Sequence, residues 1–190
     1  MTQFFKIARG GWKPDIFSQA VKVVRDGGVI IFPTETVYGI GGDGDNPETV
    51  ERIYRLKERE GEKPLARLIS GPEAIRGLLQ DEVHLRLLEE SWPGPLTVIV
   101  RVSAGETRGY RVPAHDSLRR MIRESGVELA ATSANRSGSP AINDGGEASR
   151  RFFGRVDLII DEGKVSGTAS TVLDLTVRPE KILRPGPVTR

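Results

Sequence analysis

The sequence contains no cysteine, only two histidines and no long apolar run. Without cysteine the chain forms no disulfide, no thiolate zinc site and no cysteine nucleophile, and two histidines alone argue against a zinc site. No stretch approaches the roughly 18 apolar residues of a membrane-spanning helix, and residues 1–10 lack the apolar run of a signal peptide. We therefore expect a cytoplasmic protein with no membrane partner.

Two motifs of nucleotide and ester chemistry are also missing. No G-x-x-x-x-G-K-[ST] sequence occurs, which excludes a P-loop nucleotide site. No G-x-S-x-G sequence surrounds any serine, which argues against a Ser-His-Asp hydrolase built on His84 or His115. Residues 39–44 match G-x-G-x-x-G, but the helix start signal at 46–47 comes after the glycines, and Asp43 would face a pyrophosphate with like charge. We therefore expect a turn with positive φ values here rather than a dinucleotide site.

The net charge is small for a chain of this length. The 190 residues carry 28 Lys and Arg against 26 Asp and Glu, a net charge of +2, which by itself does not predict nucleic-acid binding. Hydrophobic residues make up 37% of the chain, enough for a core at this length. We expect the 190 residues to form a single domain.

Helical and strand patterns alternate along the chain, which predicts an α/β fold. Periodicity, caps and glycine or proline boundaries predict helices at 15–26, 46–57, from 70, at 81–92 and from 116, the last capped by Asp116. Apolar runs predict strands at 29–32, 65–69, 96–102, 128–132, 156–160 and 171–175, with a loop at 33–45. Because the connections are irregular and some are short, we expect one open, mostly mixed sheet with flanking helices.

Three cations lie within seven residues at a predicted helix end. Lys57, Arg59 and Lys63 either complement the helix dipole or form a phosphate clamp, in which Arg supplies a forked donor and Lys a point charge. The clamp hypothesis predicts that Lys57→Ala or Arg59→Ala cuts turnover strongly with little change in folding. Residues 131–138 end a strand with small hydroxyl and amide groups, and 170–171 precede another, so both segments either close turns or approach a ligand.

Seven segments resemble, in order and spacing, the sequence signatures of the YrdC-like family. They are 33–39 (PTETVYG), 57–65 (KEREGEKPL), 92–97 (WPGPLT), 111–113 (RVP), 133–138 (SANRSG), 170–172 (STV) and 184–186 (RPG). The resemblance covers about residues 15–187. It implies an open, twisted α/β sheet with a large concave cavity, in the short single-domain form of the family.

The resemblance also implies an activity, that of a threonylcarbamoyl-AMP synthase. L-threonine, bicarbonate and ATP, the last with Mg²⁺, would give threonylcarbamoyl-AMP and pyrophosphate. A threonylcarbamoyl-transferase complex would then modify adenosine 37 of tRNAs that read ANN codons. A tRNA or double-stranded RNA is a further partner consistent with the family.

The resemblance assigns roles to individual residues. A threonine site would involve Thr34, Leu68, Arg111, Ala131 and Ser170, with Arg111 on the carboxylate. Contacts with ATP would come from Arg59, Lys63, Thr107, Ser133, Asn135, Ala141 and Arg184. Lys57 and Arg59 would act at the phosphates, and no protein ligand to Mg²⁺ is assigned.

Two departures from the family pattern affect the threonine site. Leu68 stands where some relatives have His, and 66–67 (AR) interrupts a strand that is usually apolar. Two alternative functions stay open. One is adenylate formation from carbamoyl phosphate, as in the related domain of hydrogenase-maturation carbamoyltransferases, and the other is a non-catalytic module that binds double-stranded RNA or tRNA.

Overall fold

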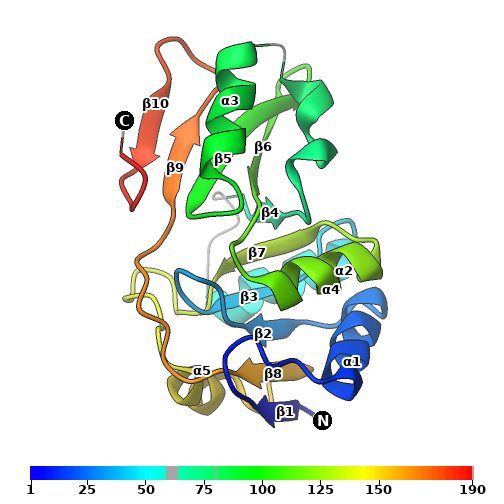
Figure 1. Ribbon diagram of the computed structural model, residues 1–190. Coiled ribbons are helices and arrows are strands. Elements are labelled where there is room, and N and C mark those ends of the chain that lie inside the picture. The colour runs from blue at the N-terminus through cyan, green and yellow to red at the C-terminus, as the bar shows by residue number, and fades with distance from the viewer. Residues whose placement is uncertain (59–63, 80, 190) are drawn as a thin grey trace.

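The computed structural model describes residues 1–58, 64–79 and 81–189, and its strands form one ten-stranded sheet flanked by helices (Figure 1). The α-helices are α1 (Pro14–Arg25), α2 (Pro47–Lys57), α3 (Glu82–Ser91), α4 (Asp116–Ser125) and α5 (Gly145–Phe152). The strands are β1 (Gln3–Lys6), β2 (Ile30–Phe32), β3 (Gly39–Asp43), β4 (Ala66–Leu68), β5 (Leu96–Ser103), β6 (Glu106–Arg111), β7 (Leu129–Ser133), β8 (Leu158–Asp161), β9 (Thr171–Asp174) and β10 (Lys181–Arg184).

The sheet has the order β1-β8-β2-β3-β7-β4-β6-β5-β9-β10 and contains both parallel and antiparallel pairs. The predicted α/β class with a mixed sheet is therefore confirmed. No helix in the described ranges is long and apolar enough to cross a membrane.

At the β1 end of the sheet, helices cover both faces because the strands are apolar on both sides. Ile30 and Phe32 pack against α1 and α4 on one face. Ile31, between them in sequence, packs with residues of α2 and α5 on the other face. This alternation explains why the run at 29–32 has no polar residue.

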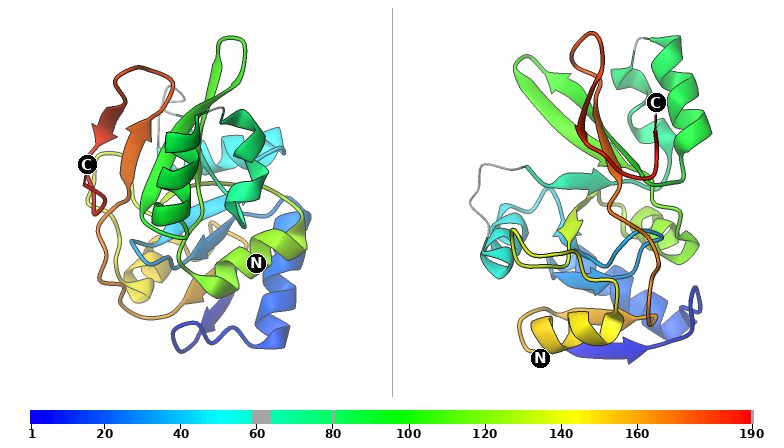
Figure 2. Two further views of the ribbon diagram at one scale, coloured as in Figure 1. Left: turned by 45° about the horizontal axis from the view of Figure 1, so that its top comes forward. Right: turned by 90° about the vertical axis from the view of Figure 1, so that its left-hand side faces the viewer.

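At the β10 end, by contrast, the core lies on one face. Val98 and Val100 of β5 pack with Tyr110 and with residues of α3 in a third core. Thr97 and Ile99, which alternate with them, line a cavity on the opposite face. The strands at the two ends of the sheet run in clearly different directions, so the uncovered face is concave (Figure 2).

The glycine run forms a strand, so the expected turn with positive φ values was wrong. Gly39–Asp43 is β3, which pairs with β2 and β7, and its glycines are not among the residues with positive φ. Close packing accounts for the glycines instead. A Cβ on Gly39 would lie 2.6 Å from the Phe32 ring, and one on Gly41 would lie 2.7 Å from the Ala130 carbonyl oxygen. The sequence signal missed the strand because glycine has a low strand propensity.

Gly41→Ala should destabilise the fold, because the obstructing atom is backbone and cannot rotate away. We expect a loss of about 1–3 kcal/mol in the free energy of unfolding, measured by urea titration. Gly77→Ala is the matched control, since a Cβ there would meet nothing within 4 Å. Equal stabilities for the two variants would contradict the close-packing explanation.

Several other local predictions differ from the structure. The helix expected from residue 70 is replaced by two short 3₁₀ turns, Pro72–Ala74 and Arg76–Leu78, where Gly77 weakens helical continuity. Asp116 is the first residue of α4, and the cap is the preceding His115, whose Nδ1 accepts from the Leu118 N–H at 3.2 Å. The elements β1, β6, α5 and β10 were not predicted from the sequence.

Glu162 anchors the N-terminal segment on the sheet. Its side chain is 1% exposed and accepts hydrogen bonds from His115 Nε2 (3.2 Å), Trp12 Nε1 (2.6 Å) and the Gly10 N–H (3.0 Å). Because Nδ1 of His115 accepts from Leu118, the neutral imidazole carries its proton on Nε2. Burial alone would raise the pKa of Glu162, but the hydrogen bonds from His115, Gly10 and Trp12 bring it below the usual value.

Acid should weaken the fold through Glu162. A carboxyl whose pKa is lower in the folded state stabilises the fold above its unfolded pKa, and this stability is lost as the pH falls through the folded pKa. We expect Glu162→Gln to lose about 1–3 kcal/mol at pH 7 and to flatten the acid limb of stability below about pH 4.5. Urea titrations at several pH values measure this, with exposed Glu89→Gln as control. An unchanged acid limb in Glu162→Gln would contradict the assignment.

Candidate active site

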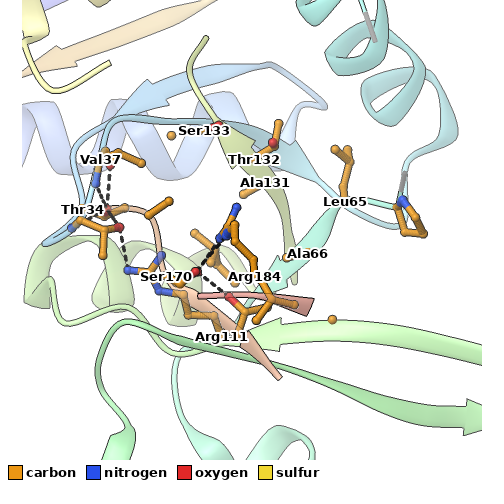
Figure 3. A pocket seen from close by; sticks show the side chains of 18 of the residues that line it. Thr34, Val37, Leu65, Ala66, Arg111, Ala131, Thr132, Ser133, Ser170 and Arg184 are labelled. Atoms are coloured by element: carbon orange, nitrogen blue, oxygen red, sulfur yellow. Dashed lines mark hydrogen bonds between the residues drawn. The ribbon is translucent and has the colours of Figure 1, made fainter. Parts of the chain in front are cut away.

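A cavity of about 280 Å³ lies on the concave face of the sheet (Figure 3). Its polar lining consists mainly of hydroxyl groups and two guanidinium groups. The residues that line it are Phe32, Thr34, Thr36, Val37, Gly39, Pro64, Leu65, Ala66, Leu68, Thr97, Ile99, Thr107, Gly109, Arg111, Ala131, Thr132, Ser133, Ala169, Ser170, Val172 and Arg184. They come from β2 to β7, β9, β10 and the segments between them, so strands from most of the sheet contribute to the site.

Arg111, at the end of β6, is fixed on three sides. Its Nε donates to the Gly94 carbonyl at 3.1 Å, and its Nη2 donates to Glu35 Oε1 at 2.6 Å and to Thr36 Oγ1 at 2.9 Å. The side chain is 9% exposed, so this ion pair is well shielded from water. Within the described part of the chain Nη1 has no hydrogen-bond partner, and it is the nitrogen left for an anion.

Thr34 lines the cavity, but its hydroxyl is used within its own turn. Oγ1 donates to the Val37 carbonyl (2.7 Å) and accepts from the N–H groups of Thr36 and Val37, both at 3.1 Å. The Thr36 hydroxyl, which accepts from Arg111, lies 2.8 Å from Thr34 Oγ1. The hydroxyls therefore connect the turn at 34–37 to the guanidinium group of Arg111.

In the part of the chain that the structure describes, Arg184 is held by Ser170. Its Nε donates to the Ser170 carbonyl (2.9 Å) and its Nη2 to the Ser170 hydroxyl (3.0 Å), which also lies 2.9 Å from the Thr97 hydroxyl. Burial first, and then the positive charge of Arg111, lower the pKa of Arg184. Two guanidinium groups in electrostatic contact across one cavity favour binding of anions.

Two of the glycine and proline motifs bring backbone atoms to these arginines. Gly94 supplies the carbonyl that binds Arg111, and a Cβ there would lie 2.3 Å from the Ser91 carbonyl oxygen. Gly186 lies against β9, where a Cβ would approach the Thr171 nitrogen to 2.4 Å. The small residues at these positions let the chain pass close enough to hold Arg111 and Arg184 in the cavity.

Comparison with known proteins identifies the family. The model of the Sua5/YciO/YrdC family, described as "Telomere recombination", matches residues 22–186. The chain belongs to this family. The Pyrococcus abyssi protein named threonylcarbamoyl-AMP synthase is 37% identical over 187 residues, which are 92% of this chain and 54% of that protein. The chain thus spans about half the length of such a relative.

Solved structures of Sua5/YciO/YrdC proteins share the fold. P. abyssi Sua5 complexed with L-threonine has a TM-score of 0.88 and 34% identity, over 97% of this chain and 58% of that one. Escherichia coli YciO has a TM-score of 0.87 and 29% identity, over 98% of this chain and 96% of that one.

The structure brings together most of the site residues named from the sequence. Eight of them line the cavity: Thr34, Leu68, Thr107, Arg111, Ala131, Ser133, Ser170 and Arg184. Lys57, Asn135 and Ala141 are not among the lining residues. Arg59 and Lys63 lie outside the described residues, although Pro64, next to Lys63, lines the cavity.

Lys57 lies behind the cavity wall in this structure. It is 2% exposed, and its Nζ donates to the Ser133 carbonyl and to Asn135 Oδ1 (3.3 Å). Asn135 in turn donates to the carbonyls of Arg136 (3.0 Å) and Ser139 (2.6 Å). Lys57 and Asn135 therefore fix the loop that follows β7 and so position Ser133.

Ala66 and Arg67 have different surroundings. This explains how a charged residue is accommodated in a strand that is usually apolar in the family. Ala66 lines the cavity together with Leu68. Arg67 alternates with them, donates to the Glu128 carbonyl (3.4 Å) and pairs with Asp45 at 3.2 Å. The charge of Arg67 is thus paired with Asp45 outside the cavity.

Sequence reasoning missed several cavity residues, among them Thr36, Thr97 and Ile99. For Thr97 a signal existed. It alternates with the apolar residues Val98 and Val100, and a polar residue in such a strand marks its other face.

Because Lys57 is buried, we no longer expect Lys57→Ala to leave folding unchanged. Lys57→Ala should lower the free energy of unfolding by about 1–3 kcal/mol, because it leaves the Ser133 carbonyl and the Asn135 amide without this donor. Urea titration measures the loss, and Lys22→Ala on the exposed surface of α1 is the control. Unchanged stability of Lys57→Ala would contradict the anchoring role and favour a direct role at the phosphates.

Proposed function

We propose that the chain is an L-threonylcarbamoyladenylate synthase. It would convert L-threonine, bicarbonate or CO2, and ATP into threonylcarbamoyl-AMP and pyrophosphate. One observation carries the proposal: Nη1 of Arg111 and Nη1 of Arg184 are both left without partners in the described part of a single cavity. An amino-acid carboxylate and a nucleotide phosphate can thus be held side by side.

The chemistry needs positioning and charge stabilisation more than a protein nucleophile. The amine captures the carbon of bicarbonate, and the resulting carbamate oxygen attacks the α-phosphorus as pyrophosphate leaves. In our proposal Arg111 holds the threonine carboxylate, while Arg184, Ser133 and Thr107 lie near the nucleotide. Arg59 and Lys63 would complete the phosphate contacts. Fixed donors around in-line reactants lower the barrier mainly by orientation and electrostatics.

Mg²⁺ would enter with ATP. The described lining offers hydroxyl and guanidinium groups rather than carboxylates, so phosphate oxygens and water would supply most of the oxygen ligands that Mg²⁺ prefers. The ion would neutralise phosphate charge during the transfer. Leu68 and Ala131 would contact threonine, and the effect of Leu68 on selectivity can be tested with serine as substrate.

The product would serve a further transfer reaction. Threonylcarbamoyl-AMP is a mixed anhydride, and we propose that a threonylcarbamoyl-transferase complex moves its acyl group to adenosine 37 of tRNAs that read ANN codons. Direct contact with tRNA or double-stranded RNA belongs to the same proposal.

Use of carbamoyl phosphate is the competing enzymatic hypothesis. The chain shares its fold with Thermococcus kodakarensis HypF, at 17% identity and a TM-score of 0.76, and at that identity the likeness concerns the fold alone. Our proposal predicts that pyrophosphate release requires threonine, whereas the competing hypothesis predicts that it requires carbamoyl phosphate.

The decisive experiment combines the protein with ATP, Mg²⁺, labelled bicarbonate and L-threonine, followed by mass analysis of the product. We expect threonylcarbamoyl-AMP, and we expect Arg111→Lys to raise the KM for threonine about tenfold or more, because lysine lacks the forked geometry. Exposed Arg101→Lys is the control. RNA binding without any adenylate product would instead favour the non-catalytic module.

A further inference from the structure

Two hydroxyl groups of the cavity lining form a pair. Thr97 of β5 and Ser170, which precedes β9, both line the cavity, and Thr97 Oγ1 lies 2.9 Å from Ser170 Oγ. Ser170 Oγ also accepts from Nη2 of Arg184 at 3.0 Å, as Figure 3 shows. A guanidinium group has no lone pair to offer, so Arg184 takes no proton from the pair.

The pair retains one hydrogen-bond donor. Each hydroxyl carries one proton, and one of the two protons lies between the oxygens of Thr97 and Ser170, whichever residue donates it. The second proton has no acceptor among the residues that the structure describes, because the other hydrogen bond of this pair comes from Arg184. A polar group left without a partner is costly, so the pair is suited to donate to a ligand in the cavity.

The register of the sheet places this donor between the two arginines. The antiparallel pairing of β5 with β6 brings Thr97 beside Arg111. On its other side Thr97 pairs with Val172 of β9, and Val172 pairs with Arg184 of β10. All four residues line the cavity, so they form one row across its concave face. A ligand that reaches from one arginine to the other therefore passes over β5, next to the hydroxyl pair.

In the proposed reaction, the group at this place is the carbamate. The carbamoyl group of threonylcarbamoyl-AMP joins the threonine nitrogen to the α-phosphate, so it lies between the carboxylate on Arg111 and the phosphate near Arg184. We propose that the Thr97–Ser170 pair is the subsite for bicarbonate and for the carbamate formed from it. This inference rests on the proposed function, and it assigns to Thr97 a role in that reaction.

The hydrogen bond acts while the C–N bond forms. The free amine of threonine adds to the carbon of bicarbonate with loss of water, and the new carbamate shares one negative charge between its two oxygens. One oxygen attacks the α-phosphorus, and the hydroxyl pair donates to the other without transferring its proton. A fixed donor at a developing negative charge lowers the barrier, and it also holds the attacking oxygen in line.

Both hydroxyls are needed, whichever of them touches the ligand. If Thr97 donates to Ser170, it fixes the Ser170 hydroxyl with its proton turned to the carbamate, and Thr97 is a positioning residue. If Ser170 donates to Thr97, the Thr97 hydroxyl itself contacts the carbamate. In both cases the two side chains act as one unit, so the effects of removing them are not additive.

The test is kcat/KM for bicarbonate in Thr97→Val, at saturating threonine and ATP, with product detected by mass. Valine keeps the branched shape and removes the hydroxyl. We expect a loss of about tenfold or more, with the KM for threonine and for ATP within about twofold of wild type. Thr97→Ser keeps the hydroxyl and should keep most of the activity. Thr49→Val is the matched control, because Thr49 is also buried, donates to the Gly27 carbonyl at 2.7 Å and is not among the lining residues.

A double variant tests whether the two hydroxyls act as a unit. Thr97→Val combined with Ser170→Ala should lose about as much kcat/KM for bicarbonate as the more damaging single variant. If Thr97→Val does not fold, Thr97→Cys serves the same test, because a thiol is a much weaker donor than a hydroxyl.

Three results would overturn the proposal. They are unchanged kinetics of the folded Thr97 variant, additive losses in the double variant, and a rise in the KM for threonine or ATP that matches the loss for bicarbonate. The last result would place the donor on the carboxylate or the phosphate, or would show a general change of the cavity. If the wild-type protein makes no threonylcarbamoyl-AMP, the proposed function itself fails and this inference falls with it.

Discussion

The fixed position of Arg111 is the constraint on which the cavity depends. Its guanidinium group is bound by the Gly94 carbonyl and by the adjacent side chains of Glu35 and Thr36, so two separate segments of the chain meet at one cation. A buried cation is costly unless its charge and its donors are satisfied, and among the contacts of the described residues only Nη1 is left open. The same contacts that stabilise the cavity wall thus define where an anion can bind.

The ten-stranded sheet makes this arrangement possible because helices cover its two ends differently. At the β1 end both faces are packed, whereas around β5 and β6 the core occupies one face only. The uncovered face is curved by the twist of the sheet and lined by hydroxyl groups and small residues. The backbone passes close to neighbouring segments at Gly94 and Gly186, and this places Arg111 and Arg184 on the uncovered face. The main role of these two glycines is therefore to allow close packing.

The sequence predicted much of the fold, for physical reasons that are local. Asn46 and Pro47 mark the start of α2, and Asp81 caps α3, because caps depend on a few neighbouring residues. β3 was missed because its glycines are required by the Phe32 ring and the Ala130 carbonyl, both of which come from other strands. Lys57 was expected at the phosphates, but its surroundings are Ser133 and Asn135, to which the local sequence gives no guide.

By itself the sequence determined the fold class, the family and eight of the residues that line the cavity, because ordered motifs and periodicity are properties of the chain alone. Only the tertiary structure decided which atoms of those residues are available. Thr34 has its hydroxyl occupied in a turn, and Arg111 has one nitrogen without a partner among the described residues. Hydrogen-bond satisfaction depends on partners distant in sequence, so it is settled when the strands assemble.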